Sequence, residues 1–420
     1  MSSALFFLAT LALFCHLALC LAVFNRLHAA GLYRRLINVL EKPILLFLLG
    51  LPSVVMWRAA VSPEVAADPL ASLFRITPAC VYFWLCFGMA LLVITIWTMR
   101  SIQRDPVQWI GYRRRLTHVH HHLGHRPCGD LACRVLARVP FNQIFGLEVN
   151  EKVFALPHLP PVLDGLSIAH FSDLHFTGRL TKDFFAFAVD QINEMQADLV
   201  AITGDLVDTV HCLPWIPEVL GRLRSRHGTY CILGNHDLRI QDVTRYRATL
   251  TQAGLHYLGG RWQELRIHGQ TIVLAGNELP WFRPAADLRS APQFGPQGRP
   301  LRILLAHSPD AIDWARRHDV DLMLAGHTHG GQIRLPVIGP IVSPSYYGVR
   351  YASGVFYVHP TLMHVSRGLS GEQALRINCR PELTKLVLRS REPIPVPAPV
   401  RSAVAPALAL PQHGHFCVEV

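Results

Sequence analysis

Five short polar clusters mark the middle of the chain, and each follows directly on an apolar run. In order they are Asp173-Leu174-His175, Gly204-Asp205, Gly234-Asn235-His236-Asp237, Ala306-His307 and Gly326-His327-Thr328-His329. Carboxylate, amide and imidazole groups without thiolates suit Mn²⁺, Fe²⁺, Co²⁺ or Zn²⁺. These donors are too numerous for one ordinary metal site. We therefore expect two divalent ions bridged by a carboxylate, an arrangement used for attack at phosphorus.

The runs that precede these clusters predict the buried strands of a layered α/β domain. They cover residues 166–171, 197–202, 229–233, 303–306 and 321–325. Ligands of open α/β sheets gather outside the carboxyl ends of the strands, where loops from several strands converge. Asp173 and His175 are two residues apart, as are His327 and His329, so each pair is expected to point to one side of extended backbone.

In this order, the five clusters resemble the pattern of the calcineurin-like metallophosphoesterases, over roughly residues 166–388. Three further segments are similar to a branch of membrane-associated bacterial phosphodiesterases that includes YkuE and YaeI, and also UDP-2,3-diacylglucosamine pyrophosphatases. These segments are residues 306–310, 326–336 and 366–369. Ser370 stands where that branch often has glycine, a departure that affects a loop and no ligand.

The resemblance implies an α/β fold, a layered α/β/β/α sandwich, with two divalent metal ions, foremost Mn²⁺, with Fe, Zn or Co as the other candidates. The first metal would be held by Asp173, His175, Asp205 and His329, and the second by Asp205, Asn235, His307 and His327. A hydroxide that bridges the two metals would be the nucleophile, because two cations depress the pKa of bound water.

The resemblance also assigns catalytic roles. His236 would stabilise or protonate the leaving oxygen, and Asp237 would orient His236. Arg179, Arg334 and Arg367 are weaker candidates for gripping phosphate, since a solvated surface charge explains each of them equally well. Taken singly, His307 is more often a packed core histidine and Asp205 a helix cap. All five clusters together favour the dimetal site over a retained but inactive one.

Three apolar runs precede this domain, and together they predict a membrane region over residues 1–98 with two to three transmembrane helices. Residues 4–24 and 78–97 are long enough to span the bilayer, whereas residues 44–57 either cross or only dip in. A cleaved signal peptide is the alternative for the first run. Basic residues follow the first and third runs, so we expect a multi-pass cell-membrane protein whose catalytic domain faces the cytoplasm.

The rest of the chain divides into three predicted segments. Residues 99–142 read as a basic, His-rich juxtamembrane connector, residues 143–388 as the catalytic domain, and residues 389–420 as a flexible Pro/Ala-rich tail. The insert at residues 281–300 is either a lid or a plain loop. The ten cysteines are scattered, which favours free thiols and a reducing compartment.

The charge composition of the chain narrows the classes of partner that we expect. The 40 Lys and Arg residues exceed the 29 Asp and Glu residues, giving a net charge of +11, and much of the excess flanks the third apolar run. This placement favours membrane lipids over nucleic acid. We expect a membrane-anchored phosphoesterase for a phosphorylated, lipid-linked substrate such as UDP-2,3-diacylglucosamine. The alternatives are a phosphodiesterase for soluble nucleotides and a scaffold or lipid-binding protein with a structural metal site; a transporter is excluded by the absence of intramembrane acidic residues.

Overall fold

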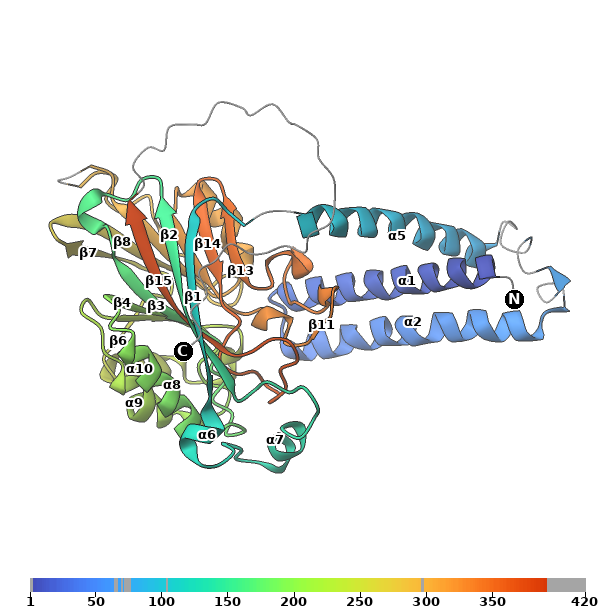
Figure 1. Ribbon diagram of the computed structural model, residues 1–420, viewed down its shortest axis with the longest axis horizontal. Coiled ribbons are helices and arrows are strands. Elements are labelled where there is room, and N and C mark those ends of the chain that lie inside the picture. The colour runs from blue at the N-terminus through green and yellow to red at the C-terminus, as the bar shows by residue number, and fades with distance from the viewer. Residues whose placement is uncertain are drawn as a thin grey trace. The chain divides into compact units, whose positions relative to one another are not determined.

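The computed structural model describes residues 3–63, 67–68, 71, 77–102, 105–295 and 298–390 (Figure 1). The chain forms two compact units. The first comprises Met1–Asp105 with Pro344–Gly348, and the second comprises Pro106–Ser343 with Val349–Val420. Nearly all of the predicted tail, residues 391–420, lies outside the described residues.

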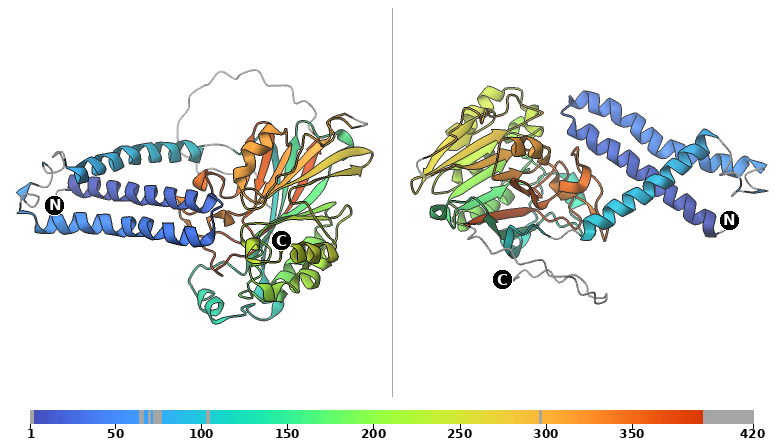
Figure 2. Two further views of the ribbon diagram at one scale, coloured as in Figure 1. Left: turned by 180° about the vertical axis from the view of Figure 1, so that it is seen from behind. Right: turned by 90° about the horizontal axis from the view of Figure 1, so that it is seen from above.

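Three long helices make up most of the first unit, α1 (Ser3–Ala29), α2 (Arg34–Val61) and α5 (Pro78–Ile102). Helix α1 contacts both α2 and α5, and α5 crosses α1 in the view from above (Figures 1 and 2). Each contains a stretch long and apolar enough to cross a membrane, over Thr10–Ala29, Arg35–Val55 and Cys80–Met99. The second apolar run, predicted either to cross or to dip in, thus lies within a continuous helix of spanning length.

His16 connects the three helices of this unit. Its Nδ1 lies 2.7 Å from the hydroxyl of Tyr82 in α5, and its Nε2 lies 3.1 Å from the carbonyl oxygen of Leu48 in α2. Such interhelical hydrogen bonds hold apolar helices together where lipid provides no hydrophobic driving force.

The second unit contains two main sheets. In spatial order, the seven-stranded sheet consists of β1 (Trp109–His118), β2 (Gly146–Leu156), β15 (Glu382–Ser390), β3 (Ser167–Phe171), β4 (Leu199–Thr203), β5 (Thr229–Ile232) and β6 (Leu255–Tyr257). The six-stranded sheet consists of β13 (Gly354–Val358), β14 (Thr361–Val365), β10 (Leu322–Ala325), β9 (Leu301–Ala306), β8 (Gln270–Asn277) and β7 (Trp262–Ile267). A small hairpin pairs β11 (Arg334–Leu335) with β12 (Gly339–Pro340).

Strand alternation explains the layers. Ile168 and Ala201 face a core shared with Ile303 and Leu324 of the other sheet, whereas their strand neighbours face a second core filled by the helices. The helices that cover the seven-stranded sheet are α8 (Lys182–Glu194), α9 (Trp215–Val219) and α10 (Val243–Gln252), and α11 (Ile312–Arg317) packs on β14 of the other sheet (Figure 1). The predicted layered α/β sandwich is confirmed.

The prediction that residues 99–142 form a connector is wrong in its main feature. β1 pairs antiparallel with β2, so residues 109–118 belong to the seven-stranded sheet of the second unit. The arginines at 113–115 alternate across this strand and therefore do not form one headgroup-facing patch. Two short helices follow, α6 (Val119–Leu123) and α7 (Leu131–Leu136), and Val119 is fully buried in the core.

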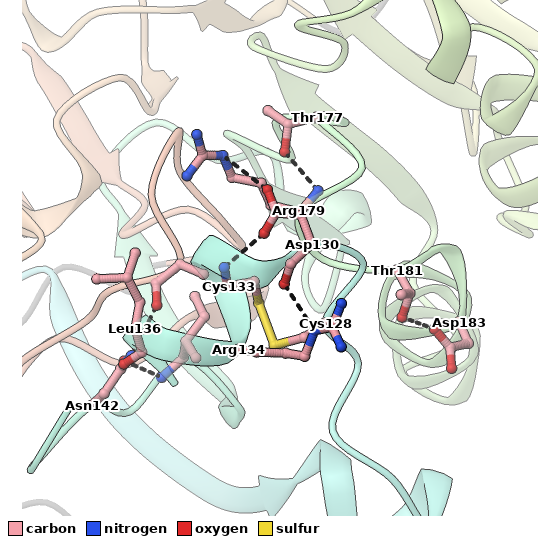
Figure 3. The surroundings of a disulfide bond; sticks show 12 residues. Cys128, Asp130, Cys133, Arg134, Leu136, Asn142, Thr177, Arg179, Thr181 and Asp183 are labelled. Carbon is pink, nitrogen blue, oxygen red and sulfur yellow. Dashed lines mark hydrogen bonds and ion pairs between the residues drawn. A yellow bond between two sulfur atoms is a disulfide. The ribbon is translucent and has the colours of Figure 1, made fainter. Parts of the chain in front are cut away.

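Cys128 and Cys133 form a disulfide, contrary to the prediction of free thiols throughout (Figure 3). The carboxylate of Asp130 caps α7 by accepting a hydrogen bond from the amide of Cys133 at 2.7 Å. The amide of Gly129 donates to the carbonyl oxygen of Arg179 at 2.8 Å. The disulfide loop is therefore held against the chain just beyond His175.

Glu278, which follows β8, is almost fully buried in this domain. Its Oε1 accepts a hydrogen bond from the amide of Leu233 at 2.5 Å, and its Oε2 accepts one from the hydroxyl of Tyr257 at 2.8 Å. Burial raises the pKa of Glu278 to about 7, with Asp237 adding to the rise and Arg247 opposing it.

We predict that the stability of the protein depends on pH and that Glu278→Gln weakens this dependence. The folded state holds the Glu278 proton more tightly than the unfolded chain does, so the free energy of unfolding falls as pH rises towards about 7. Each tenfold difference in proton affinity between the two states corresponds to about 1.4 kcal/mol. Thermal unfolding at about pH 5 and pH 8 should show a smaller difference for Glu278→Gln than for the wild type. Equal differences in the two proteins would contradict this prediction.

Candidate metal centre

The predicted ligands lie just beyond the carboxyl ends of parallel strands. Asp173 follows β3, Asp205 follows β4 and Asn235 follows β5, while His307 and His327 follow β9 and β10 of the facing sheet. Both sheets therefore deliver side chains to one edge of the sandwich, as the sequence predicted.

Three overlapping groups of possible metal ligands gather at this edge, and within each group the ligand atoms lie within 4.8 Å of one another. The first group is Asp173, His175, Asp205 and His329, the second is Asp205, His307 and His327, and the third is His175, Asp208 and His236. Asn235 joins the second group, since its Oδ1 is 3.0 Å from Nε2 of His307. The first two groups are the side chains that the resemblance assigned to the two metals, and Asp205 is common to both.

Asp205 is the carboxylate on which the imidazoles converge. Its buried Oδ2 has no hydrogen-bond partner among the described residues, but Nε2 of His175 and of His307 lie 3.5 and 3.4 Å from it. Nε2 of His329 lies 3.2 Å from Nε2 of His175. A buried carboxylate oxygen among converging ring nitrogens is the donor set that a divalent cation requires, so the residues fit a divalent metal ion.

The opposite ring nitrogen of three histidines is held by an oxygen. Nδ1 of His175 lies 2.9 Å from Oδ1 of Asp208, Nδ1 of His307 lies 2.7 Å from the carbonyl oxygen of Thr203, and Nδ1 of His329 lies 3.1 Å from the carbonyl oxygen of Ser370. An Nδ1–H donated to each oxygen leaves the Nε2 lone pair free for a metal. The tautomers are thus set by the surrounding chain.

The backbone of the ligands lies in an uncommon conformation. Asp173, His175, Asp205, His327 and His329 all have positive φ, between 47° and 71°. Residues with side chains rarely adopt this left-handed region, and such strain concentrates at functional sites.

Gly204 makes the approach of the two sheets possible at this edge. A Cβ atom on Gly204 would lie 2.5 Å from Nδ1 of His307. Only glycine therefore lets the backbone before Asp205 pass so close to a ligand of the facing sheet.

His236 lies beside the metal ligands, but Asp237 does not orient it as expected. The buried carboxylate of Asp237 accepts hydrogen bonds from the amides of Leu206, Val207 and Gly234, and these bonds hold the loop after β4 in place. Nδ1 of His236 lies instead 3.0 Å from Oδ2 of Asp208. Asp208 thus holds both His175 and His236. The signal in the sequence was the second carboxylate in Gly204-Asp205-Leu206-Val207-Asp208.

The charges of this cluster shift its pKa values. Burial opposes protonation of His236, but the carboxylates of Asp205 and Asp208 outweigh it and raise the pKa of His236 to about 9. Despite its burial, Asp208 has a pKa well below its usual value, because His175 and His236 stabilise its charge. In the metal-free protein, His236 is therefore cationic at neutral pH.

Comparison with known proteins agrees with this geometry. Residues 166–331 match the family model for calcineurin-like phosphoesterases. The metallophosphoesterase YkuE of Bacillus subtilis is 33% identical over 251 residues, which cover 58% of this chain and 86% of YkuE. The chain belongs to the calcineurin-like phosphoesterase family.

Two further relatives of this phosphoesterase differ in what surrounds the domain. The phosphodiesterase YaeI of Escherichia coli is 30% identical over 225 residues, covering 53% of this chain and 81% of YaeI. A protein of Bos taurus named transmembrane protein with metallophosphoesterase domain is 33% identical over 251 residues, covering 55% of each chain. The phosphoesterase thus resembles both a bacterial phosphodiesterase and a transmembrane protein.

The three arginines predicted to grip phosphate each contact other side chains of the domain. Arg367 lies in a buried cluster, where its Nη2 is 2.7 Å from carboxylate oxygens of both Glu148 and Glu382. Arg179 donates a hydrogen bond to Oε1 of Gln373 at 2.6 Å. Arg334 lies in β11, 3.4 Å from the hydroxyl of Ser353. Arg367 is thereby removed as a phosphate ligand, because two buried carboxylates already neutralise it.

Arg376, which sequence reasoning missed, is fully buried beside the metal centre of the phosphoesterase. Its Nη1 donates to the carbonyl oxygens of Arg367 at 2.6 Å and His329 at 3.2 Å, and its Nη2 donates to the carbonyl oxygen of Ser370. The guanidinium therefore braces the loop that carries His329. A single arginine gives no sequence signal for this role.

A second missed feature is a buried chain of polar side chains between the two sheets. Nζ of Lys152 lies 2.8 Å from Nε2 of His364, Nδ1 of His364 lies 2.8 Å from Nδ1 of His170, and Nε2 of His170 lies 3.0 Å from the hydroxyl of Thr203. The carbonyl of Thr203 then holds His307. Burial lowers the pKa of His170 to about 3, so its ring is neutral and shares single hydrogen bonds with its neighbours.

The predicted insert, residues 281–300, contributes one aromatic ring to the site. The Trp281 ring centroid lies 4.8 Å from that of His327 and 5.3 Å from that of His307. Trp281 therefore packs beside the second ligand group, while residues 296–297 of the insert lie outside the described residues.

We predict that Asp208→Asn weakens metal binding, because the amide no longer holds the two histidines through charge. Loss of such a supporting partner costs roughly 10–100-fold in affinity. Titration of the full-length protein with Mn²⁺ measures this change. Asp190→Asn, at an exposed carboxylate paired with Arg222, is the matched control and should bind as the wild type does. Equal affinity of Asp208→Asn and wild type would contradict the role of Asp208.

Proposed function

We propose that this protein is a membrane-anchored dimetal phosphoesterase that hydrolyses a phosphodiester or pyrophosphate bond. The observation that carries the proposal is the carboxylate of Asp205, which belongs to the first two groups of converging ligands. Divalent metal ions, when bound, would supply Lewis-acid chemistry by polarising phosphoryl oxygens and lowering the pKa of water. Manganese is the ion we expect first, because oxygen and imidazole ligands suit it.

His236 is the residue of this chain that moves a proton in the proposed reaction. Asp208 holds its Nδ1, so Nε2 is the nitrogen left for the substrate. From this position Nε2 is placed to donate a hydrogen bond or a proton to the leaving oxygen, and the charge of Asp208 favours the protonated ring. Asp208 acts through His236 by fixing its ring, and buried Asp237 acts only through the loop that it organises.

The proposed substrate is an amphiphilic phosphate ester or anhydride such as UDP-2,3-diacylglucosamine. Its support is the combination of a phosphoesterase site with three helices long and apolar enough to cross a membrane. An anchored enzyme meets a lipid-linked substrate at high local concentration. We further propose a multi-pass protein whose catalytic domain faces the cytoplasm, on the strength of the basic residues that follow the first and third apolar runs.

We predict that the detergent-solubilised full-length protein hydrolyses bis-p-nitrophenyl phosphate with Mn²⁺ and loses this activity on chelation. His236→Ala should lower kcat by roughly 10²–10⁴-fold while bound manganese is unchanged, because the residue donates a proton and is not a ligand. His268→Ala, in the exposed turn between β7 and β8, is the control that should keep full activity.

The same assay with a UDP-linked diacylated sugar tests the substrate. A higher kcat/KM for the lipid nucleotide than for the small diester would support the amphiphilic substrate. Activity on the small diester alone would leave the phosphoesterase and remove the lipid-linked substrate. No activity on either compound would favour a scaffold with a structural metal site.

A further inference from the structure

A solvent-exposed apolar tip projects from the β11–β12 hairpin, which begins five residues after His329. Four consecutive residues, Leu335, Pro336, Val337 and Ile338, are exposed, and Val337 has 87% of its surface accessible. Single exposed apolar residues are ordinary, but a contiguous run at the end of a hairpin marks an interaction surface.

The backbone at this tip indicates that Val337 is not placed there for folding. The amide of Ile338 donates to the carbonyl oxygen of Pro336 at 2.7 Å, and Val337 between them has φ of 67°. This is the three-residue turn with positive φ that is rare and strained, above all for a β-branched residue. Glycine would form the same turn without strain. An apolar side chain that costs stability and contacts solvent is accounted for by a partner outside the domain.

The hairpin is joined firmly to the metal-binding loop. The amide of Arg334 donates to the carbonyl oxygen of Ile377 at 2.9 Å, and the amide of Ile377 donates to that of Gln332 at 3.1 Å. A Cβ atom on Gly331 would lie 2.4 Å from Cβ of Pro340, so the base of the hairpin packs directly on the chain that follows His329. A partner bound at the tip would therefore lie at a fixed position relative to the metal ligands.

We propose that this apolar tip inserts into the surface of a lipid bilayer and so presents the metal centre to substrate held in the membrane. The occupant follows from the chain itself, because three of its helices are long and apolar enough to cross a membrane and so tether the domain to one. Arg334 at the base of the hairpin supplies positive charge that complements anionic headgroups. An apolar tip with a basic residue beside it is the pattern of an interfacial membrane contact.

This inference deepens the proposed function and rests on it only for its consequence, the choice of substrate. The contact itself is measured without turnover. Val337→Cys in the full-length protein is labelled with a polarity-sensitive fluorophore and reconstituted into phosphatidylethanolamine–phosphatidylglycerol vesicles. His268→Cys, in the β7–β8 turn that lies at the start of β8, away from the strand ends carrying the ligands, is the matched control. Unsubstituted protein carried through the labelling measures the background from native cysteines.

The expected result is a blue-shifted emission at position 337 that is quenched when the phospholipids carry a nitroxide on the acyl chain, with neither effect at position 268. Emission at position 337 that is insensitive to the nitroxide lipids would overturn the proposal. A blue shift that depends on the protein-to-lipid ratio and is not quenched would instead identify a second copy of the chain as the occupant, which also overturns it.

Activity supplies a second, independent test. Val337→Asp should lower hydrolysis of a vesicle-embedded phosphodiester by roughly tenfold, as expected from losing the burial of one valine side chain, and leave hydrolysis of bis-p-nitrophenyl phosphate unchanged. Val337→Gly relieves the backbone strain, so it should raise the unfolding temperature while also lowering activity on the embedded substrate. A Val337→Gly protein that keeps full activity on that substrate would contradict membrane insertion. If the wild-type protein does not hydrolyse the soluble diester, the result would count against the proposed function and not against membrane insertion.

Discussion

The geometry of the candidate metal centre depends on the carboxylate of Asp205, because two groups of possible metal ligands share it. A carboxylate buried at the edge of a two-sheet core is costly unless cationic or hydrogen-bonding groups surround it. The parallel strands meet that requirement. β3 and β4 deliver the side chains of one sheet, and β9 and β10 bring His307 and His327 from the facing sheet to the same edge.

Contacts with the surrounding chain stabilise the strained backbone of the converging ligands. The positive φ of the ligand residues is held by backbone hydrogen bonds across the edge, such as that from the amide of Asp173 to the carbonyl oxygen of Gly204 at 3.0 Å. Two buried charged side chains also hold the ligands in place: Arg376 braces the His329 loop, and Asp208 holds the rings of His175 and His236. The candidate ligands are thus held in place by the buried groups that surround them.

The sequence indicated which side chains gather at this edge, because their signal is local. Each ligand follows an apolar strand within a few residues, so strand ends and ligand types could be read together. The contacts of Arg367 could not be predicted, since its partners Glu148 and Glu382 are brought together only by the pairing of β2 with β15. The same pairing problem hid β1, whose arginine-rich sequence resembles a solvated linker and becomes a strand only because β2 lies beside it.

The prediction that Asp237 orients His236 failed for a similar physical reason. Adjacent residues after a strand point in different directions, and which carboxylate reaches an imidazole is decided by the loop's backbone rather than by sequence distance. Asp237 turns inward to bind the amides of Leu206 and Val207, so Asp208 is the carboxylate left facing His236.

The most direct test of the shared carboxylate is the number of metal ions bound per chain. Elemental analysis of the full-length protein after saturation with Mn²⁺ and removal of excess ion should give two manganese ions per chain for the wild type. Asp205→Asn, which keeps the size of the side chain but removes its charge, should lose at least one of the two. A wild type that saturates at one ion, or an Asp205→Asn protein that retains both, would contradict a site built around this carboxylate.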